Sequence, residues 1–273
     1  MTEYETITSE EVDHICIITL NRAQVHNAFN PQMISELTQE FTKQNTNPNI
    51  RAIILTGEGK SFSAGADLVY MEASKDFTLN ENQQDAVKLE KLFNTIYTSS
   101  KPIVGRINGA AFGGGVGLVA LCDIVIAIKR AIFAFSEVNL GILPAVISPY
   151  VIPKIGYSHS TRYFLTGERF DASTALRIGL IHEIATDQDE LNQKVTTIIN
   201  HLFASGPIAI SQIKEILDQN RRRSFENVRP YLIEKIAQIR TSPEGKEGLK
   251  AFLEKRGANW KKDEWGRYKD RTE

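Results

Sequence analysis

The stretch Asn108-Gly109-Ala110-Ala111-Phe112-Gly113-Gly114-Gly115-Val116-Gly117 follows a run of β-branched residues and leads into an apolar segment that ends near Cys122. Glycine has no Cβ, so this stretch lets the backbone turn sharply and approach a ligand closely. It predicts a tight turn after a strand and the start of a helix, whose first N–H groups have no partner within the helix. Close packing of that helix is the other explanation for so many glycines.

A second stretch of similar design lies upstream of the first. Ser61-Phe62-Ser63-Ala64-Gly65-Ala66-Asp67-Leu68 follows a strand that we expect at 51–56, and it leads into another helix. Together the two turns can aim two backbone N–H donors at one carbonyl oxygen. Such a pair forms an oxyanion hole, which stabilises the enolate that a thioester forms at its α-carbon.

A carboxylate follows farther along the chain. Phe135-Ser136-Glu137-Val138-Asn139-Leu140-Gly141-Ile142-Leu143-Pro144 places Glu137 after an apolar strand and before a glycine-proline turn. A carboxylate within hydrogen-bond reach of a substrate carbon or a water molecule can move a proton there. We therefore expect Glu137 to be the acid/base residue of the site, rather than a surface glutamate.

The rest of the chain predicts a mixed α/β protein. Short runs rich in Ile and Val predict strands at 14–20, 51–56, 102–107, 123–128, 132–135 and 180–184. Apolar spacing predicts helices at 31–44, 85–97, 189–204, 207–220, 224–241 and 243–256. We expect a core at 1–188 and a helical region at 189–273, and the successive strand-then-glycine-turn passages indicate a repeated ββα unit.

Composition narrows the class of protein further. The chain has 273 residues, and 32 Lys and Arg against 33 Asp and Glu argue against a nucleic-acid or anionic-membrane partner. Cys16 and Cys122 lie in apolar runs, which predicts no disulfide framework, and the histidine spacing predicts no metal site. The acidic first 13 residues do not resemble a signal peptide, and the apolar stretch 115–128 is too short for a bilayer. We expect a cytoplasmic protein without a membrane span.

In this order, the motifs resemble the crotonase family, the enoyl-CoA hydratase and isomerase superfamily. The resemblance runs nearly from end to end, through Asn21-Arg22, Asn27-Ala28, 63–67, 108–109, 113–115, Cys122-Asp123, Ser136-Glu137, 165–168, Gly179-Leu180 and 251–256. It implies a spiral of ββα units with a helical C-terminal region that drives formation of a homotrimer, often as a dimer of trimers. It also implies an acyl-CoA thioester substrate and no cofactor, because coenzyme A enters as part of the substrate.

The resemblance assigns roles to individual residues. The backbone N–H groups of Ala66 and Gly114 would form the oxyanion hole, and Glu137 would be the catalytic acid/base. The residues that it implies for substrate and CoA binding are Arg22, Val25, Ala64, Ala66, Asp67, Leu68, Gly114, Phe252 and Lys255.

One departure from the family pattern bears on the reaction. Gly117 stands where hydratases with two catalytic glutamates carry the other carboxylate. A lone glutamate suits an isomerase, which moves one proton between C2 and C4. An enoyl-CoA hydratase, a Δ3,Δ2-enoyl-CoA isomerase and a non-catalytic acyl-CoA-binding protein therefore all stay open.

A second departure narrows the branch of the family. Ala145 stands where the branches for dienoyl isomerisation or dehalogenation carry an aspartate. The motifs at 113–118, 136–138, 144–150 and 241–245 resemble bacterial methylglutaconyl-CoA hydratases. This resemblance implies a hydratase for 3-methylglutaconyl-CoA or another branched enoyl-CoA, in leucine or fatty acid degradation.

Overall fold

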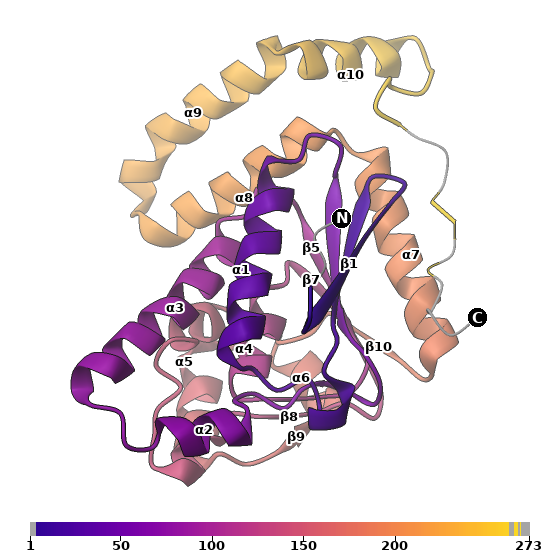
Figure 1. Cartoon of the computed structure of the whole chain (residues 1–273). Coiled ribbons are helices and arrows are strands. Elements are labelled where there is room, and N and C mark those ends of the chain that lie inside the picture. The colour runs from indigo at the N-terminus through magenta and orange to yellow at the C-terminus, as the bar shows by residue number, and fades with distance from the viewer. Residues whose placement is uncertain (1–3, 262–264, 267, 269–273) are drawn as a thin grey trace.

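The structure, a computed structural model, describes residues 4–261, 265, 266 and 268. Two β-sheets form its core, with helices outside them (Figure 1). The larger sheet has six strands, and neighbours are parallel except in the β1–β2 hairpin. In sheet order they are β1 (Ile7–Val12), β2 (Ile15–Leu20), β3 (Ala52–Gly57), β5 (Ile103–Ile107), β7 (Ile124–Ile128) and β10 (Glu183–Ala185).

The smaller sheet shows the repeat of the fold. It consists of β4 (Ser61–Ser63), β6 (Ala110–Phe112), β8 (Ile132–Ala134) and β9 (Phe170–Asp171), and β4, β6 and β8 are parallel. Each of these three short strands directly follows a strand of the larger sheet, and helical residues come after it. The expected α/β class and the repeated ββα unit are therefore confirmed.

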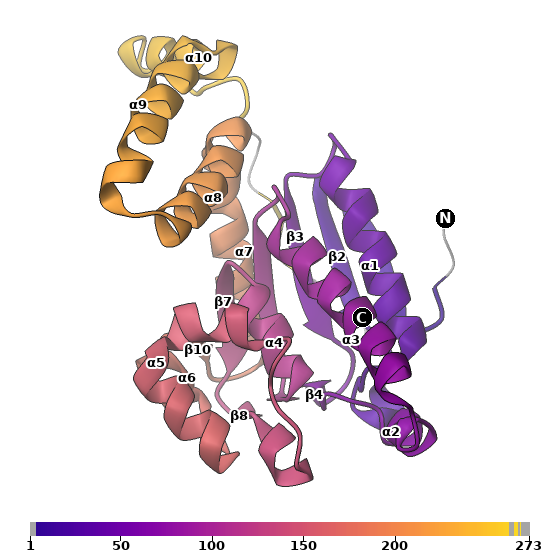
Figure 2. The same ribbon diagram turned by 90° about the vertical axis from the view of Figure 1, so that its left-hand side faces the viewer.

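Helices cover both faces of the larger sheet. α1 (Pro31–Thr46) and α3 (Leu79–Tyr97) pack together on one side, and α7 (Gln188–Ala204) lies on the other (Figure 1, Figure 2). The strands between them are almost wholly apolar, as expected for a parallel sheet buried on both faces. The remaining helices are α2 (Leu68–Ser74), α4 (Gly114–Leu121), α5 (Ser148–Thr166), α6 (Ala172–Arg177), α8 (Pro207–Arg222), α9 (Phe225–Thr241) and α10 (Pro243–Leu253), with the short 3₁₀ helices η1 (Ala23–Val25) and η2 (Ser136–Leu140).

Local backbone chemistry explains where the observed helices differ from the predicted ones. α3 begins at Leu79 instead of 85, because Thr78 and Glu81 form a capping box at its N-terminus. The sequence did not predict α5, since Pro153 lies inside it and Gly156, with φ of 74°, kinks it.

The strand predictions missed the short and the polar strands. β4, β6 and β9 span only two or three residues, and β1 contains the polar run Ser9 to Glu11. β10 covers Glu183–Ala185, so it starts later than the predicted strand at 180–184. Pairing with neighbouring strands defines these strands, and such pairing is a tertiary contact that local propensity does not reveal.

The C-terminal helices form an arm beyond the core. α9 and α10 lie at the end of the molecule opposite α2 (Figure 1), and large apolar side chains such as Phe225, Ile233 and Phe252 are exposed on the arm. α7 differs from them, because it packs on the larger sheet. The division at 188/189 stays a prediction.

No helix in the described part of the chain combines the length and the apolar character needed to cross a membrane.

Candidate active site

Three parallel strands of the smaller sheet end at one edge. β4 ends at Ser63, β6 at Phe112 and β8 at Ala134. The carboxyl ends of neighbouring parallel strands meet, and ligands of α/β proteins commonly bind there. This edge therefore brings together the two glycine-rich turns and the residues around Glu137.

Gly113 is the point at which these three segments meet. A Cβ added to Gly65 would stand 2.8 Å from the carbonyl oxygen of Phe112, so the first turn lies directly against the second. A Cβ added to Gly113, whose φ is 50°, would stand 3.2 Å from Oε1 of Glu137. The carboxylate and both turns are therefore neighbours, as the sequence predicts.

The first turn presents the backbone N–H of Ala66. The preceding carbonyl, of Gly65, accepts a hydrogen bond of 2.6 Å from the N–H of Phe29. A trans peptide points its N–H opposite to its C=O, so this bond fixes the direction of the Ala66 N–H. Ala66 is exposed between buried Gly65 and buried Asp67, and its N–H has no acceptor among the described residues.

The second turn presents the N–H of Gly114 by a different route. The carbonyl of Gly113 accepts hydrogen bonds from Val116 (2.9 Å) and Gly117 (3.2 Å) in the first turn of α4. The Gly113–Gly114 peptide is thus held by the helix, and its N–H is one of the donors that a helix N-terminus leaves free. Within the described chain no acceptor lies in reach of this N–H, and Gly114 is half-buried. Two free N–H donors therefore flank Gly113.

Glu137 is half-buried, and one of its carboxylate oxygens lies buried beside these donors. Its Oε2 has no accessible surface and no hydrogen-bond partner among the described residues. Burial raises the pKa of this carboxyl group above its usual range, and a hydrogen bond from its own backbone N–H offsets only part of that effect. A buried polar atom without a partner is costly to a folded protein and needs an explanation. A proton carrier waiting for substrate is one.

Position 117 has no room for a second carboxylate. A Cβ added to Gly117 would stand 2.5 Å from Cγ2 of Ile147 and 2.8 Å from Cε1 of Phe93. The ring of Phe93 is stacked on Tyr150, with 6.0 Å between ring centroids, so it is held in place. Apolar side chains therefore fill the volume that a carboxylate at position 117 would need.

The residues expected beside CoA fall into two groups. Leu68 is 80% exposed at the start of α2, and Ala64 and Val25 are half-buried, so these three lie at the surface of the site. Asp67 is only 3% exposed, and its carboxylate forms an ion pair of 2.7 Å with Arg22. The structure thus places Arg22 and Asp67 against each other rather than in solvent beside the turn.

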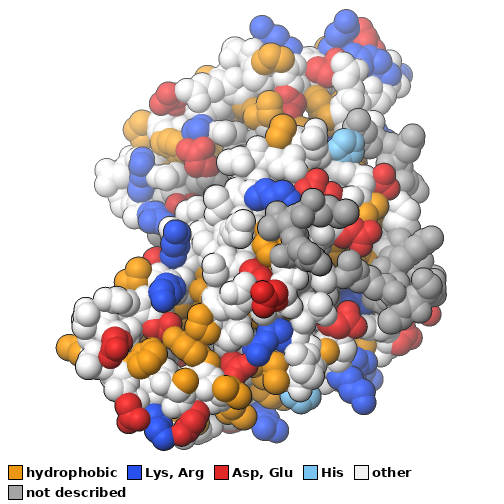
Figure 3. Space-filling view, in the orientation of Figure 1, with side chains coloured by type: hydrophobic (Ala, Val, Ile, Leu, Met, Phe, Trp, Pro, Cys, Tyr) orange, Lys and Arg blue, Asp and Glu red, His pale blue; other side chains and the backbone are white. Residues whose placement is uncertain are grey.

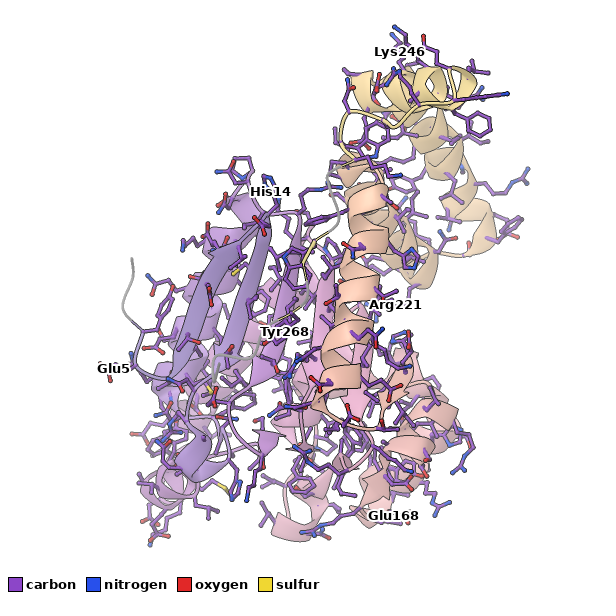
Figure 4. All side chains as sticks on the ribbon, turned by 90° about the vertical axis from the view of Figure 1, so that its right-hand side faces the viewer. Glu5, His14, Glu168, Arg221, Lys246 and Tyr268 are labelled. Atoms are coloured by element: carbon purple, nitrogen blue, oxygen red, sulfur yellow. The ribbon has the colours of Figure 1, made fainter. Side chains whose placement is uncertain are left out.

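Phe252 and Lys255 lie far from this site within one chain. Phe252 is in the last turn of α10 and Lys255 follows that helix, and α10 lies at the opposite end of the molecule from α2 and β8 (Figure 1). Figure 4 shows the same separation, with Lys246 of α10 at one end and Glu168, which precedes β9, at the other. The prediction that these two residues join the others in one site therefore does not hold within a single chain.

Three apolar residues that shape the site were not predicted as site residues from the sequence. Phe29 holds the first turn and would stand 2.8 Å from a Cβ on Gly114, and Phe93 and Ile147 fill the space beside Gly117. Phe29 directly follows Asn27-Ala28, and Ile147 lies in 144–150, so family motifs pointed to both. Phe93 had no such signal, because its helical spacing is that of any core residue.

The described residues contain no group of three or more His, Cys, Asp or Glu side chains that could hold a metal ion. Two backbone donors beside one buried carboxylate suit proton transfer next to a carbonyl group that becomes an enolate.

Comparisons with known proteins agree with this class of site. Residues 10–263 match the family model described as enoyl-CoA hydratase/isomerase. A putative enoyl-CoA hydratase of Thermus thermophilus is 31% identical over 246 residues, which are 90% of this chain and 97% of that protein. The crotonyl-CoA hydratase of Syntrophomonas wolfei is 30% identical over 259 residues, covering 94% of this chain and 98% of that protein.

A solved structure agrees with the fold as well. The crystal structure of an enoyl-CoA hydratase from Shewanella pealeana has a TM-score of 0.90 and 38% identity, and the match covers 94% of this chain and 97% of that one. The chain belongs to the enoyl-CoA hydratase/isomerase family and is an enzyme of that family. The expected crotonase fold is confirmed.

Proposed function

We propose that this protein is an enoyl-CoA hydratase, which adds water across the C2–C3 double bond of an acyl-CoA thioester or removes it. The observation that carries the proposal is the unpartnered, buried Oε2 of Glu137 next to two free backbone N–H donors, those of Ala66 and Gly114. Two proteins named as hydratases match this chain over nearly their whole length, and they support the same reaction.

The reaction uses the three groups as follows. The ionised carboxylate of Glu137 takes a proton from water as the water oxygen bonds to C3. The electron pair of the C2–C3 double bond moves toward the thioester, whose oxygen becomes an oxyanion held by the N–H groups of Ala66 and Gly114. A proton then reaches C2 from the Glu137 carboxylic acid, and the carboxylate is restored.

An isomerase is the second candidate, and the environment of position 117 favours it. Phe93 and Ile147 fill the place of a second acid, so Glu137 is left to act alone. One carboxylate is sufficient to remove a proton from C2 of a 3-enoyl thioester and return it at C4, or to remove it from C4 of the 2-enoyl thioester and return it at C2 in the reverse reaction. The same two N–H groups would hold the dienolate.

The substrate that we propose carries a branched acyl group, such as 3-methylglutaconyl-CoA, in leucine or fatty acid degradation. The motifs shared with methylglutaconyl-CoA hydratases support this choice. Coenzyme A enters as part of the substrate, and we propose that no further cofactor takes part.

We also propose that the protein works in the cytoplasm as a homotrimer or a dimer of trimers. Hydrophobic side chains gather on the surface around α2, at the lower end of the molecule in Figure 3. Leu68 and Val69 of α2 and Phe252 of α10 are each more than three-quarters exposed. A second chain would cover such surfaces, and it would let Phe252 and Lys255 reach CoA in the site of another protomer.

A panel of three thioesters tests the reaction and the substrate together. Crotonyl-CoA, 3-methylglutaconyl-CoA and a 3-enoyl-CoA are incubated with the protein in ¹⁸O-labelled water, and the products are identified by mass. Uptake of solvent oxygen, fastest with the methylglutaconyl ester, is the expected result. A 2-enoyl product without oxygen uptake would identify an isomerase. Tight binding without turnover of any ester would leave a non-catalytic acyl-CoA-binding protein.

A further inference from the structure

The loop that carries Ala66 is fastened to a segment from elsewhere in the chain, the residues between β2 and α1. The N–H of Asp67 donates to the carbonyl of Phe29 (2.8 Å), and the N–H of Phe29 donates to the carbonyl of Gly65 (2.6 Å). The N–H of Ala64 donates to the carbonyl of His26 (2.9 Å). These bonds use the amides on both sides of Ala66 and leave its own N–H facing the site.

A charged pair joins the same two segments. Nη1 of Arg22 lies 2.7 Å from Oδ2 of Asp67 and donates to the carbonyl of Ala28 at 2.7 Å. The other carboxylate oxygen of Asp67 accepts hydrogen bonds from the N–H groups of Val69 (2.8 Å) and Tyr70 (3.1 Å), which caps α2. Both oxygens of this carboxylate are therefore occupied within the protein.

The burial of the pair argues against direct contact with CoA. The Arg22 side chain is 17% exposed and that of Asp67 only 5%. Burial alone would raise the pKa of Asp67, but the hydrogen bonds from Arg22 and from the backbone of α2 hold it below its usual range. Asp67 is thus an ionised group directed into the protein, and a carboxylate would repel the phosphates of CoA.

We infer that Arg22 and Asp67 are positioning residues, which set the direction of the Ala66 N–H in the oxyanion hole rather than bind CoA. The inference rests on the proposed function, because it concerns how the same hole is built. Phe29 holds the Gly65–Ala66 peptide, which carries the Ala66 N–H, and the ion pair of Asp67 fixes the residue that follows Ala66 in the chain. Arg22 acts on the substrate only through Asp67.

The test separates catalysis from binding in Arg22→Met, Asp67→Asn and the double variant. Asp67→Asn keeps an oxygen acceptor for α2 but loses the charge. For each variant, kcat and KM are measured with the best enoyl-CoA substrate, and the Kd of free CoA, which has no thioester carbonyl, is measured by calorimetry. We expect kcat to fall about 10- to 100-fold, because an N–H donor that is displaced from the oxyanion loses most of its effect. The Kd of CoA should change less than threefold.

Conservative and double substitutions show whether the two residues act as a unit. Arg22→Lys keeps the positive charge and should recover part of the lost kcat. The double variant should lose less than the product of the two single losses, because each single variant leaves a buried charge without its partner. A matched control is Lys194→Met, which breaks an ion pair of 2.9 Å with Glu183 between α7 and β10 and should leave kcat unchanged.

Two outcomes would overturn the inference. A tenfold or larger rise in the Kd of CoA with kcat within twofold of wild type would make Arg22 and Asp67 CoA ligands. Equal losses of kcat in the Lys194→Met control would make the effect one of general stability.

If the wild-type protein turns over no enoyl-CoA, the proposed function fails. The inference is then tested by the infrared frequency of a ¹³C-labelled thioester carbonyl bound to each variant, which should move toward the free value in the variants alone.

Discussion

The two halves of the oxyanion hole are built by different physical means. The Ala66 N–H is held by hydrogen bonds and an ion pair between segments that are about 40 residues apart in the chain. The Gly114 N–H is held by the first turn of α4, through hydrogen bonds that span three or four residues. One half therefore depends on charge and on tertiary structure, and the other depends on a helix and on glycine. Substitutions should affect them separately.

The largest loss of kcat should come from replacing Glu137, whose carboxylate lies beside both halves of the oxyanion hole. Glu137→Gln removes the proton carrier but keeps the size of the side chain, so we expect kcat to fall by about 10³-fold or more. The Kd of CoA should stay near the wild-type value, since Glu137 acts at the acyl group and free CoA has none. Steady-state kinetics and calorimetry measure both, and a fully active variant would contradict the role of Glu137.

The raised pKa of Glu137 adds a signature in pH. The carboxylate must be ionised to take a proton, so kcat/KM should decline as the pH falls through the raised pKa, above the ordinary 4.5.

The stability of the protein should change with pH in the opposite direction, because the buried charge of Glu137 disfavours the folded state above that pKa. Glu137→Gln should therefore melt higher than wild type near neutral pH, and the difference should vanish below about pH 4.5. Melting curves at several pH values measure this.

The next largest loss of activity should come from displacing the Gly114 N–H, which the first turn of α4 holds in place. Gly113→Ala places a Cβ at φ of 50° and 3.2 Å from Oε1 of Glu137. Activity should fall about 100-fold, because the Gly114 N–H and the carboxylate both shift. Gly156→Ala is the matched control, since its φ of 74° is equally unfavourable and its Cβ would meet no atom within 4 Å. Loss of activity in both variants would assign the effect to backbone strain.

Filling position 117 should not create a two-glutamate hydratase. Gly117→Glu forces side-chain atoms into Ile147 and Phe93, and overpacking of this kind costs roughly 1–3 kcal/mol or more of stability. Chemical denaturation measures that loss. Gly117→Glu combined with Ile147→Ala should recover part of the stability, because it removes the nearest contact. An unstrained, more active Gly117→Glu protein would show that the apolar filling of this position is dispensable.

The smallest expected effect concerns a buried carboxylate without a catalytic role. Glu40 of α1 is fully buried, and its oxygens accept hydrogen bonds from Tyr4, Ser9 and Gln44. Burial opposes its ionisation, but these bonds hold its pKa below the usual value. It therefore stabilises the fold above about pH 4.5, and this contribution is lost as the pH falls. Glu40→Gln should cost about 1–3 kcal/mol at pH 7 and less in acid, with unchanged kcat.

The two halves also differ in how far the sequence predicted them. The glycine-rich stretch 108–117 is local, so its turn and the helix that follows could be predicted directly from residue types, although the short strand β6 within it could not. The first turn was recognised as well, but its support by Phe29 and by the Arg22–Asp67 pair depends on contacts between distant segments. Resemblance to the family indicated that Arg22 and Asp67 matter and assigned them to CoA, whereas the structure turns their charges toward each other.

Position 117 shows a similar limit of the sequence. The missing carboxylate was visible in the chain, but the side chains that replace it were not. Phe93 and Ile147 come from a helix and a loop that meet Gly117 only in the folded protein. The arm of α9 and α10 shows the opposite limit, because these helices were predicted from their apolar spacing while their distance from the site was not.

The central claim is that the N–H groups of Ala66 and Gly114 act on one thioester oxygen. The infrared stretching frequency of a ¹³C-labelled acyl-CoA carbonyl, bound to the wild-type protein, tests this directly. Two hydrogen bonds to the oxygen weaken the C=O bond, so we expect the frequency to lie below that of the same thioester in water. A bound carbonyl with the frequency of free thioester would contradict the assignment of these two turns as an oxyanion hole.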